Sequence, residues 1–308
     1  MRKNFQVAVL IPCYNEEKTI EKVIKDFYRV LPEATIYVCD NNSNDKTAEL
    51  SKKNGAIVLK EPKQGKGYAF LKLLQEVNSD IYLLVDGDDT YPAEYAHKMI
   101  EALVDHKLDM VVGDRISNGT YQKENDRAFH SFGNNLVKNL INHLFNSNLN
   151  DILSGYRVFS KSFVHNYTTL VKGFELETDL TLFALNYAVG IKEIQVDYKN
   201  RPEGSYSKLN TYRDGLKIII LFFNLYRFYK PLAFFGYLSL FLLLLSLFIG
   251  AMPIYEYLQY GYVYKVPSAI LATGLTLSAL LFFCCGLILD SILKIDRKNI
   301  KRKMYHAR

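Results

Sequence analysis

The stretch DIYLLVDGDDTYP, residues 80–92, runs from an apolar segment directly into three acidic residues, Asp86, Asp88 and Asp89. A short continuous apolar run is typical of a strand buried on both faces of a parallel sheet. In an extended strand end, residues i and i+2 point the same way, so the carboxylates of Asp86 and Asp88 are expected to converge on one ion. Carboxylates crowded at one strand end repel each other, so the sequence predicts a cation there.

Strand-like and helix-like segments alternate on both sides of this stretch, which predicts an α/β fold with a mostly parallel sheet covered by helices. Ligands of such sheets bind beyond the carboxyl ends of the strands, where the polar runs PCYNEE, DNNSND, DGDDTYP and GDR occur. Strands are predicted at 5–11, where Pro12 is expected to end the first, and at 35–40, 56–60, 80–86, 109–115 and 191–198, with a short one in DILSGYRVFSK. Helices are predicted at 16–31, 47–54, 65–77, 93–105, 127–145 and 174–190.

The acids suit a hard divalent cation, because Mg²⁺ and Mn²⁺ prefer carboxylate and phosphate oxygens. Asp86 and Asp88 are the predicted metal ligands, and Gly87 between them lets the backbone approach a ligand closely. An isolated DxD pattern is common in solvated turns, so its position after a buried strand carries the prediction. The sequence has no dinucleotide fingerprint and no Walker motif, and its four cysteines show no zinc-ligand spacing.

Two charge-free segments, Leu232–Met252 and Val266–Leu289, are each long enough to cross a bilayer as a helix. The alternative is a buried core hairpin, but LSLFLLLLSLFIG is apolar on every face. We expect a two-helix transmembrane hairpin over 231–289. The preceding segment, 211–230, is amphipathic and predicts a helix at the membrane surface, with an ordinary core helix as the alternative.

Basic residues flank the hairpin on one side only. Arg227 and Lys230 precede it, the connecting loop carries only Lys265, and seven Lys or Arg follow in the tail 290–308. The positive-inside rule predicts a multi-pass protein of the cell membrane with both termini in the cytoplasm. Most of the net charge of +6 lies in this tail, which favours contact with anionic lipid over binding to nucleic acid. No N-terminal signal peptide is expected. Small residues in the spans would allow homo-oligomer contacts: Gly236, Gly250, Gly274 and Gly286.

Further motifs follow the acidic turn in order: R...S at Arg127 and Ser131, D..SGYR at 151–157, FELETDL, and Y.NR..GSYSKLNTYRDG at 198–215. With IPCYNEE, DNNSND.T, GKGYA, DGDDTYP and GDR, the chain resembles a family 2 glycosyltransferase with the Rossmann-like GT-A nucleotide-sugar fold. More narrowly it resembles polyprenyl-phosphate glycosyltransferases of the dolichyl-phosphate mannose synthase type. The resemblance covers about 1–230 and implies a cytosolic catalytic domain at 1–210.

The resemblance implies roles for individual residues. Those implied to line the nucleotide site are Pro12, Tyr14, Asn15, Glu16, Asp40, Asn42, Lys66, Asp86 and Gly87. Those implied to grip the acceptor phosphate or close over the substrates are Arg115, Arg127, Ser131, Arg201, Ser207 and Lys208. On the sugar side they are Asp151 and Arg157, and the catalytic set is Asp86, Asp88, Asp89, Arg115 and Arg127.

The chemistry of a phosphate acceptor agrees with this pattern. A phosphate is already anionic at neutral pH, so it attacks without a general base and needs placement and charge compensation, which arginine provides. A single attack at the anomeric carbon inverts its configuration. We therefore expect transfer of a sugar from a nucleotide sugar to polyprenyl (undecaprenyl) phosphate, with Mg²⁺ or Mn²⁺ as cofactor. The resemblance favours UDP-glucose or UDP-GlcNAc as the donor.

Several alternatives stay open. A glycosyltransferase acting on a lipid or glycan hydroxyl would need a catalytic carboxylate, for which Glu177, Asp179 and Asp89 are candidates, although we favour a structural or sugar-contacting role for the first two. A non-catalytic membrane adaptor could have kept the same fold. A processive synthase is disfavoured, because the chain has no Trp and only two predicted spans. Bland alternatives for site residues are helix capping by Asp40, Asn42 and Asp45, packing by Tyr14, and surface ion pairs of Arg157 and Arg201.

Overall fold

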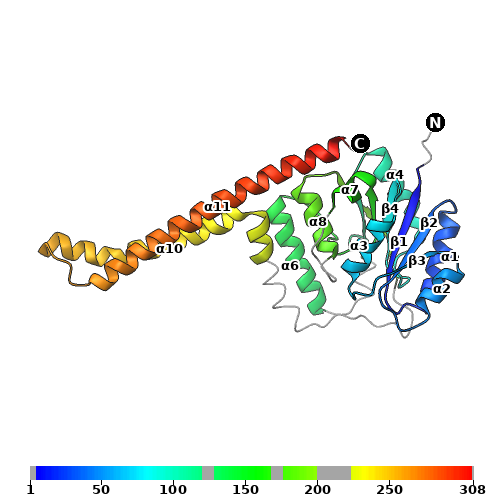
Figure 1. Ribbon diagram of the computed structural model, residues 1–308, viewed down its shortest axis with the longest axis horizontal. Helices are drawn as coiled ribbons and strands as arrows, with labels where there is room; N and C mark the ends of the chain where they lie inside the picture. Colours follow the sequence, from blue (N-terminus) through cyan, green and yellow to red (C-terminus); the bar gives the residue numbers. More distant parts are fainter. Residues whose placement is uncertain (1–4, 120–127, 168–175, 200–222, 307–308) are drawn as a thin grey trace. The chain divides into compact units, whose positions relative to one another are not determined.

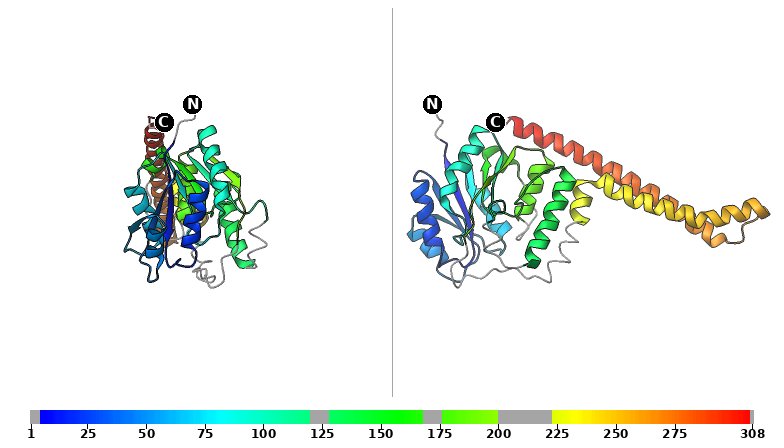
Figure 2. Two further views of the ribbon diagram at one scale, coloured as in Figure 1. Left: turned by 90° about the vertical axis from the view of Figure 1, so that its right-hand side faces the viewer. Right: turned by 180° about the vertical axis from the view of Figure 1, so that it is seen from behind.

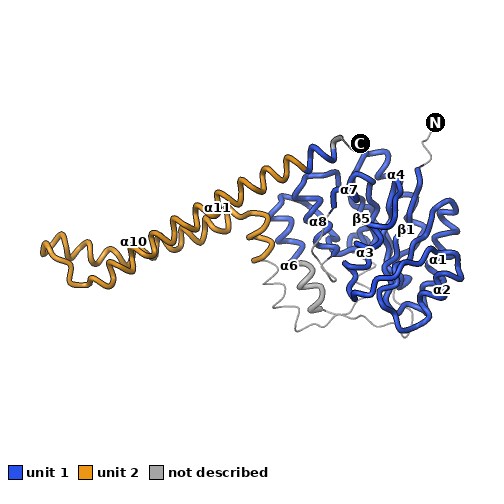
Figure 3. Tube along the Cα trace, in the orientation of Figure 1, with its two compact units in different colours: residues 1–211, 300–308 blue, residues 212–299 orange. Residues whose placement is uncertain are grey.

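The computed structural model describes residues 5–119, 128–167, 176–199 and 223–306, without the side chains of 128–135. It divides into two compact units (Figure 3). The first comprises Met1–Thr211 together with Ile300–Arg308, and the second comprises Tyr212–Asn299.

The first unit is built on a seven-stranded sheet with the order β3-β2-β1-β4-β6-β5-β7. Strand β6 runs antiparallel to β4 and β5, and every other pairing that the structure describes is parallel. The predicted α/β fold with a mostly parallel sheet is therefore confirmed. The strands are β1 (Val7–Cys13), β2 (Thr35–Asp40), β3 (Ile57–Lys60), β4 (Ile81–Leu84), β5 (Met110–Asp114), β6 (Arg157–Ser160) and β7 (Ile191–Gln195).

Helices cover both faces of the sheet (Figures 1 and 2). One apolar cluster joins the sheet to α1 (Ile20–Val30), α2 (Thr47–Lys53) and, after the short η1 (Ala93–Tyr95), to α4 (Ala96–Asp105). A second cluster on the opposite face joins it to α3 (Lys66–Glu76), α7 (Lys161–Asn166) and α8 (Leu176–Asn186). This unit also contains α6 (Ala128–Phe145). Helix α7 was not predicted from the sequence, and its first turn is capped by the Ser160 hydroxyl.

The first strand runs further than predicted, because Pro12 lies within β1 and pairs with Cys39 of β2. The pairing of β1 with β4 ends at Leu10 and Leu84. The Val85 N–H donates to the Leu10 carbonyl, which shows that Leu10, and by alternation Pro12, presents its polar groups toward β4. The missing N–H of Pro12 therefore falls beyond the end of β4 and costs no ladder hydrogen bond.

The antiparallel direction of β6 decides which loop reaches the carboxyl edge of the sheet. Arg157 pairs with Leu84 at the end of β4 and with Val112 of β5. The loop that precedes β6, residues 151–156, therefore lies beside the acidic turn that follows β4. A uniformly parallel sheet would have placed this loop at the opposite edge.

The second unit contains the long helix α10 (Pro231–Tyr260) and α11 (Val266–His306) as far as Asn299, and the two helices lie side by side (Figures 1 and 2). Two serine hydroxyls of α10 donate across the pair: Ser239 to the Ala279 carbonyl and Ser246 to the Ala272 carbonyl, each at 2.7 Å. Both helices are long and apolar enough to cross a membrane. Only 6% of the most apolar window of α10 and 17% of that of α11 is buried, which argues against an ordinary core hairpin.

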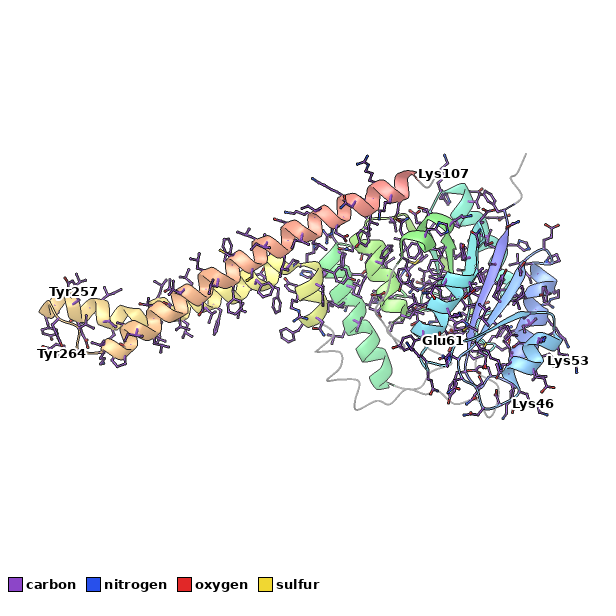
Figure 4. The ribbon with its side chains drawn as sticks, viewed as in Figure 1. Lys46, Lys53, Glu61, Lys107, Tyr257 and Tyr264 are labelled. Carbon is purple, nitrogen blue, oxygen red and sulfur yellow. The ribbon has the colours of Figure 1, made fainter. Side chains whose placement is uncertain are left out.

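The turn between α10 and α11 is closed by Glu256, whose carboxylate accepts hydrogen bonds from the backbone N–H groups of Tyr264 and Lys265. Tyr257 and Tyr264 mark this end of the hairpin (Figure 4). Tyrosines at the end of an exposed apolar hairpin are typical of the membrane–water interface.

The four glycines singled out in the spans divide into two pairs. An added Cβ on Gly250 would meet Ala272 at 3.3 Å, and one on Gly286 would meet Phe235 at 3.0 Å, so the hairpin itself uses these two. No atom of the described residues lies within 4 Å of the corresponding position on Gly236 or Gly274. Contacts between copies through these two glycines stay a prediction.

The region predicted as a basic tail, 290–308, continues α11 as a helix as far as His306. Its last residues belong to the first unit, where Ile300 packs against the apolar cluster that includes α7 and α8. Met304 is buried, and its carbonyl accepts a hydrogen bond from Ser162 at 3.3 Å. Ile300 and Met304 are four residues apart and so share one helix face, which the count of basic residues did not reveal.

Most of the predicted interface segment, 211–222, lies outside the described residues. Residues 223–229 are helical, with Phe223 and Phe228 exposed and Leu225 buried. An interface role for this segment stays a prediction.

Candidate functional site

The carboxyl ends of the parallel strands form the edge that carries the predicted site residues. Glu61, directly after β3, lies in the lower half of the first unit in Figure 4, and Lys46, in the loop after β2, lies below it in that view. The same edge receives the acidic turn after β4 and, through antiparallel β6, the loop 151–156.

The loops after β1 and β2 are tied to one another. The backbone N–H of Asn15 donates to the Ser43 hydroxyl at 3.0 Å, and that of Asn44 donates to the Asn15 side chain at 2.9 Å. Asn15 and Asn42 adopt positive φ angles of 54° and 63°, which asparagine tolerates better than most residues. These loops, which include the predicted nucleotide residues Asn15, Glu16 and Asn42, therefore form one ordered surface.

Two neighbouring residues at the end of β2 have different partners. Asp40 is buried and accepts a hydrogen bond from the Ser43 N–H at 3.3 Å, so it orders the turn and does not cap α2. Asp45 lies one residue before the N-cap, Lys46, and accepts from the N–H of Thr47, the first residue of α2, at 2.9 Å. Asn41 was missed by the sequence analysis. It joins the loops by donating to the carbonyls of residues 61 and 63 and accepting from the N–H of residue 65.

The acidic turn differs from the extended strand end that the sequence argument assumed. Strand β4 ends at Leu84, and the following residues form a turn, so strict alternation does not set the directions of the acids. Asp88 is buried, and its carboxylate accepts from the Thr90 hydroxyl at 2.6 Å and the Thr90 N–H at 3.3 Å. The carbonyl of Gly87 accepts from the Thr19 hydroxyl at 2.7 Å. The turn is therefore held from both sides.

Gly87 has a packing reason of its own to be glycine. A Cβ at this position would lie 2.7 Å from the sulfur of Cys13, inside van der Waals contact. Burial raises the pKa of the Cys13 thiol well above its ordinary value, so this cysteine stays neutral and acts as an apolar packing group.

Asp89, included in the predicted catalytic set, is paired with Lys22 of α1. Its φ angle is 59°, so it occupies the left-handed position of the turn. The ion pair and the left-handed conformation of Asp89 therefore help to fix the turn.

Lys66 links two carboxylates from different parts of the chain. Its ammonium lies 2.5 Å from Asp86 Oδ1 and also contacts the carboxylate of Glu177 on α8. The Lys66 side chain is 13% exposed, that of Asp86 25% and that of Glu177 7%. Burial alone would lower the pKa of Lys66, but the charges of Asp86 and Glu177 more than offset this and raise it. Lys66 is therefore a permanent cation at the base of the acidic turn.

The other carboxylate oxygen of Asp86 faces Gly155 of the loop before β6. A Cβ on Gly155 would lie 2.5 Å from Asp86 Oδ2. The N–H of Gly155 donates to the Tyr91 hydroxyl at 3.0 Å. Asp86 is thus held between Lys66 and a glycine backbone, and Gly155 joins the site as a residue for which the motif D..SGYR was the signal.

Gly155→Ala is expected to lower turnover by about 10- to 100-fold, because the added methyl group must displace the carboxylate of Asp86 and small misplacements at a reacting site cost that much. Circular dichroism should show that the fold is kept, and turnover should be measured with the donor saturating. Gly236→Ala is the matched control, since its Cβ meets no described atom within 4 Å. Equal activity of the two variants would contradict the role given to Gly155.

Arg115 and Asp151 form a second charged pair at this edge. The Nε and Nη2 atoms of Arg115 donate to the two carboxylate oxygens of Asp151 at 2.8 and 3.3 Å, and Nη1 donates to the Tyr91 hydroxyl at 3.1 Å. The guanidinium also stacks over the ring of Tyr198, 5.5 Å from its centre. The Asp151 side chain is fully buried and that of Arg115 is 11% exposed. The buried carboxylate of Asp151 therefore holds the guanidinium of Arg115 in a fixed orientation.

Glu193 of β7 supports Asp151 from below. Its carboxylate accepts hydrogen bonds from the backbone N–H groups of Asn150 and Asp151 at 2.8–2.9 Å. Burial raises the pKa of Glu193, although these two hydrogen bonds act in the opposite direction. The sequence analysis missed this residue, whose one signal was an acidic side chain inside a predicted strand.

Arg157, predicted on the sugar side, lies inside the protein and is fully buried. It donates to the carbonyls of Ile152 and Ser154 at 2.6 and 2.8 Å and to the Thr181 hydroxyl at 3.0 Å. The alternative of a surface ion pair is therefore wrong. Arg157 supports the loop 151–156 through its backbone, because a buried guanidinium needs several acceptors.

The structure does not describe the side chains of five residues that were predicted to bind the acceptor. Arg127, Arg201, Ser207 and Lys208 lie outside the described residues, and for Ser131 the structure gives only a place in the backbone of α6. Pro12 is buried within β1, and Tyr14 is half-buried in the loop that follows.

The donor set at the acidic turn fits a Mg²⁺ or Mn²⁺ ion shared with a substrate. Among the described residues, no group of three or more His, Cys, Asp or Glu side chains could hold a metal. One or two carboxylates completed by substrate phosphates and water is the usual way in which Mg²⁺ is bound. Asp86 and Asp88 would supply two hard oxygen ligands to such an ion, and Thr90 orients the carboxylate of Asp88.

Comparison with known proteins agrees with this geometry. Residues 8–168 match the family model described as glycosyl transferase family 2. The chain is 31% identical over 304 residues to the glycosyltransferase AglJ of Haloferax volcanii, with 96% of each chain covered. It is 28% identical over 212 residues to a dolichyl-phosphate hexose transferase of the same organism, covering 69% of this chain and 90% of that one. The fold also matches a structure of glucosyl-3-phosphoglycerate synthase from Mycobacterium tuberculosis in complex with Mn²⁺, UDP-glucose and phosphoglyceric acid. That match has a TM-score of 0.52 and 20% identity, and covers 65% of this chain and 73% of that one.

Proposed function

Because the chain belongs to glycosyl transferase family 2, we propose that it transfers a hexose from a nucleotide diphosphate sugar to a polyprenyl phosphate at a membrane surface. The observation that carries the proposal is a family 2 fold joined to two long apolar helices whose surfaces are exposed. A relative that matches over 69% of this chain is named for transfer to a dolichyl phosphate. A lipid-linked acceptor explains why such a fold would be tied to a membrane.

The nucleotide sugar would bind along the joined loops after β1 and β2 and the acidic turn after β4. UDP is the proposed nucleotide, since the solved fold relative carries UDP-glucose and Mn²⁺. Asp86 and Asp88 would hold a divalent ion, which compensates the charge of the leaving diphosphate when bound. Lys66, a buried cation that contacts both Asp86 and Glu177, compensates part of the negative charge of this site before the ion binds.

The acceptor phosphate would approach on the side of Arg115. Its guanidinium is fixed by Asp151, Tyr91 and Tyr198, so little order has to be gained when a phosphate binds. An anionic phosphate oxygen can attack the anomeric carbon directly, and a single attack inverts the configuration at that carbon. An α-linked donor would therefore give a β-linked lipid phosphate sugar.

Membrane attachment follows from the same helices. With α10 and α11 as the spans, the excess of basic residues on one side supports a topology in which the catalytic unit and both termini lie in the cytoplasm. The tyrosines at the turn of the hairpin would lie at the opposite membrane surface.

The alternative of a hydroxyl acceptor requires a carboxylate that is available as a base. Glu177 is engaged by Lys66, and Asp179 accepts a hydrogen bond from the Tyr167 hydroxyl at 2.7 Å. Asp89 is paired with Lys22. These three candidates already have partners, which favours an acceptor that brings its own negative charge.

A reconstituted assay tests the proposal. The purified full-length protein in detergent or nanodiscs would be given Mn²⁺ or Mg²⁺, a panel of UDP- and GDP-sugars, and undecaprenyl or dolichyl phosphate, and lipid-linked sugar would be measured by mass spectrometry. We expect product with at least one UDP-hexose, dependence on the divalent ion, and a β linkage by NMR.

The acceptor chemistry is decided by parallel reactions with the corresponding polyprenol, which lacks the phosphate. Product with the alcohol and none with the phosphate would overturn the acceptor assignment in favour of the hydroxyl alternative. Nucleotide binding without product from any donor and acceptor would favour a non-catalytic adaptor.

A further inference from the structure

The ion pair network at the base of the acidic turn has a feature that the proposed reaction does not use. Lys66 contacts two carboxylates, Asp86 after β4 and Glu177 in the first turn of α8, which are separated by 91 positions in the sequence. All three side chains are at least three-quarters buried, so the ammonium has exchanged water for these two partners. A buried ammonium with two alternative anionic partners can move between them without losing its charge compensation.

Formal charges show why such a movement would occur. Asp86 and Glu177 carry two negative charges, and Lys66 carries one positive charge. Lys66 therefore compensates the cluster only in part and leaves room for a divalent ion. The ammonium and that ion both require Asp86, however, and two cations on one carboxylate repel each other.

We propose that the Lys66 ammonium occupies the cation position at Asp86 before the metal binds. When the divalent ion binds, the ammonium moves away from Asp86 and keeps only its ion pair with Glu177. Glu177 is thus a positioning residue that acts through Lys66. The inference rests on the proposed metal site at Asp86 and Asp88, and it adds a competition between a side chain and the metal for one ligand.

Local structure supports Glu177 in this role. It lies in the first turn of α8, where the positive end of the helix dipole favours a carboxylate. Its turn is held in place because the Thr181 hydroxyl donates to the Glu177 carbonyl at 3.0 Å and accepts from the buried Arg157. Glu177 is therefore held in one position, whereas the long side chain of Lys66 is flexible and can move.

If Lys66 competes with the metal, removing Lys66 and removing the charge of Glu177 should change the affinity for Mn²⁺ in opposite directions. Without Lys66, the metal no longer has to displace a cation, so Lys66→Met should bind Mn²⁺ more tightly than the unmodified protein. Without the charge of Glu177, the ammonium has no second anionic partner and stays on Asp86, so Glu177→Gln should bind Mn²⁺ more weakly. We expect each change to be about tenfold or more, since a charge at this distance alters the proton affinity of a carboxylate by about 10- to 1,000-fold.

The double variant separates this competition from a general loss of negative charge. If Glu177 acts through Lys66, removing Glu177 should matter little once Lys66 is absent, and Lys66→Met/Glu177→Gln should bind Mn²⁺ about as tightly as Lys66→Met. If Glu177 only attracts the metal through space, the double variant should be weaker than Lys66→Met by the same factor that Glu177→Gln alone shows.

The measurement is a titration of the full-length protein with Mn²⁺ in the absence of nucleotide, followed by electron paramagnetic resonance of the free ion. Lys72→Met is the matched control, because Lys72 lies on the same helix, is half-buried and pairs with Glu76 one turn further along that helix. Circular dichroism verifies that each variant is folded. Weaker or unchanged Mn²⁺ binding by Lys66→Met would overturn the inference.

Failure of the inference differs from failure of the proposed function. If the unmodified protein binds Mn²⁺ neither alone nor with UDP, the metal site itself is wrong. If it binds Mn²⁺ but the Mn²⁺ affinities of Lys66→Met and Glu177→Gln do not change in opposite directions, the metal site stands. The proposed movement of Lys66 from Asp86 to Glu177 is then wrong.

Discussion

Asp88→Asn is expected to lower turnover by more than about 100-fold while the protein keeps its fold. Loss of a group that only supports a metal ligand typically costs about 10- to 100-fold, and loss of a ligand charge should cost more. The fold should survive because the amide oxygen of asparagine can still accept from the Thr90 hydroxyl, which lies 2.6 Å from Asp88. Turnover at saturating donor and circular dichroism of the same sample provide the measurement.

Two neighbouring variants make the result specific. Thr90→Val removes the hydroxyl that orients Asp88, and its effect should fall within the about 10- to 100-fold range of a supporting group. Asp89→Asn removes a charge that is paired with Lys22, and its effect should stay below that of Thr90→Val. If Asp88→Asn retained full activity, the acidic turn would have no role in binding metal.

Arg115→Met is expected to destabilise the catalytic unit by about 3–5 kcal/mol, because the fully buried carboxylate of Asp151 would lose its ionic partner. For a domain of this size, that corresponds to a fall of about 6–20 °C in the melting temperature. The same variant should lose transfer to lipid phosphate, since the oriented guanidinium is gone. Thermal unfolding followed by circular dichroism would measure the first effect.

The double variant Arg115→Met/Asp151→Asn distinguishes stability from function. Replacing both partners removes the unpaired charge, so much of the stability should return. Transfer to lipid phosphate should remain lost, and nucleotide binding should be close to that of the unmodified protein. Recovery of transfer together with stability would show that Arg115 is structural only.

Much of the fold was predictable from local sequence. Apolar runs and helical periodicity located the strands and most helices, because each element of such a sheet buries a face whose period is visible in the chain. The direction of β6 was not predictable in the same way, since parallel and antiparallel strands of four residues look alike. That direction brings Gly155 beside Asp86, so part of the site was hidden with it.

The site shows the same division. Asp86, Asp88 and Arg115 were visible because charged residues directly after apolar strands have few structural reasons to be there. Lys66 and Glu177 were both singled out, but their mutual contact was not predicted, because they come together only through the packing of α3 and α8. Glu193 and Asn41 were missed, since single polar residues acting through backbone groups leave no pattern in the sequence.

The last turns of α11 have a practical consequence for anyone who needs a water-soluble version of the enzyme. Cutting the chain ahead of α10 would discard Ile300 and Met304 along with the two long apolar helices and would uncover the apolar surface on which they pack. Such a fragment would be prone to aggregate, although its sequence would include the whole sheet. A variant in which a flexible linker replaces 231–299, with 300–306 kept, would lack the exposed apolar helices. Residues 300–306 would still cover the apolar surface of the first unit.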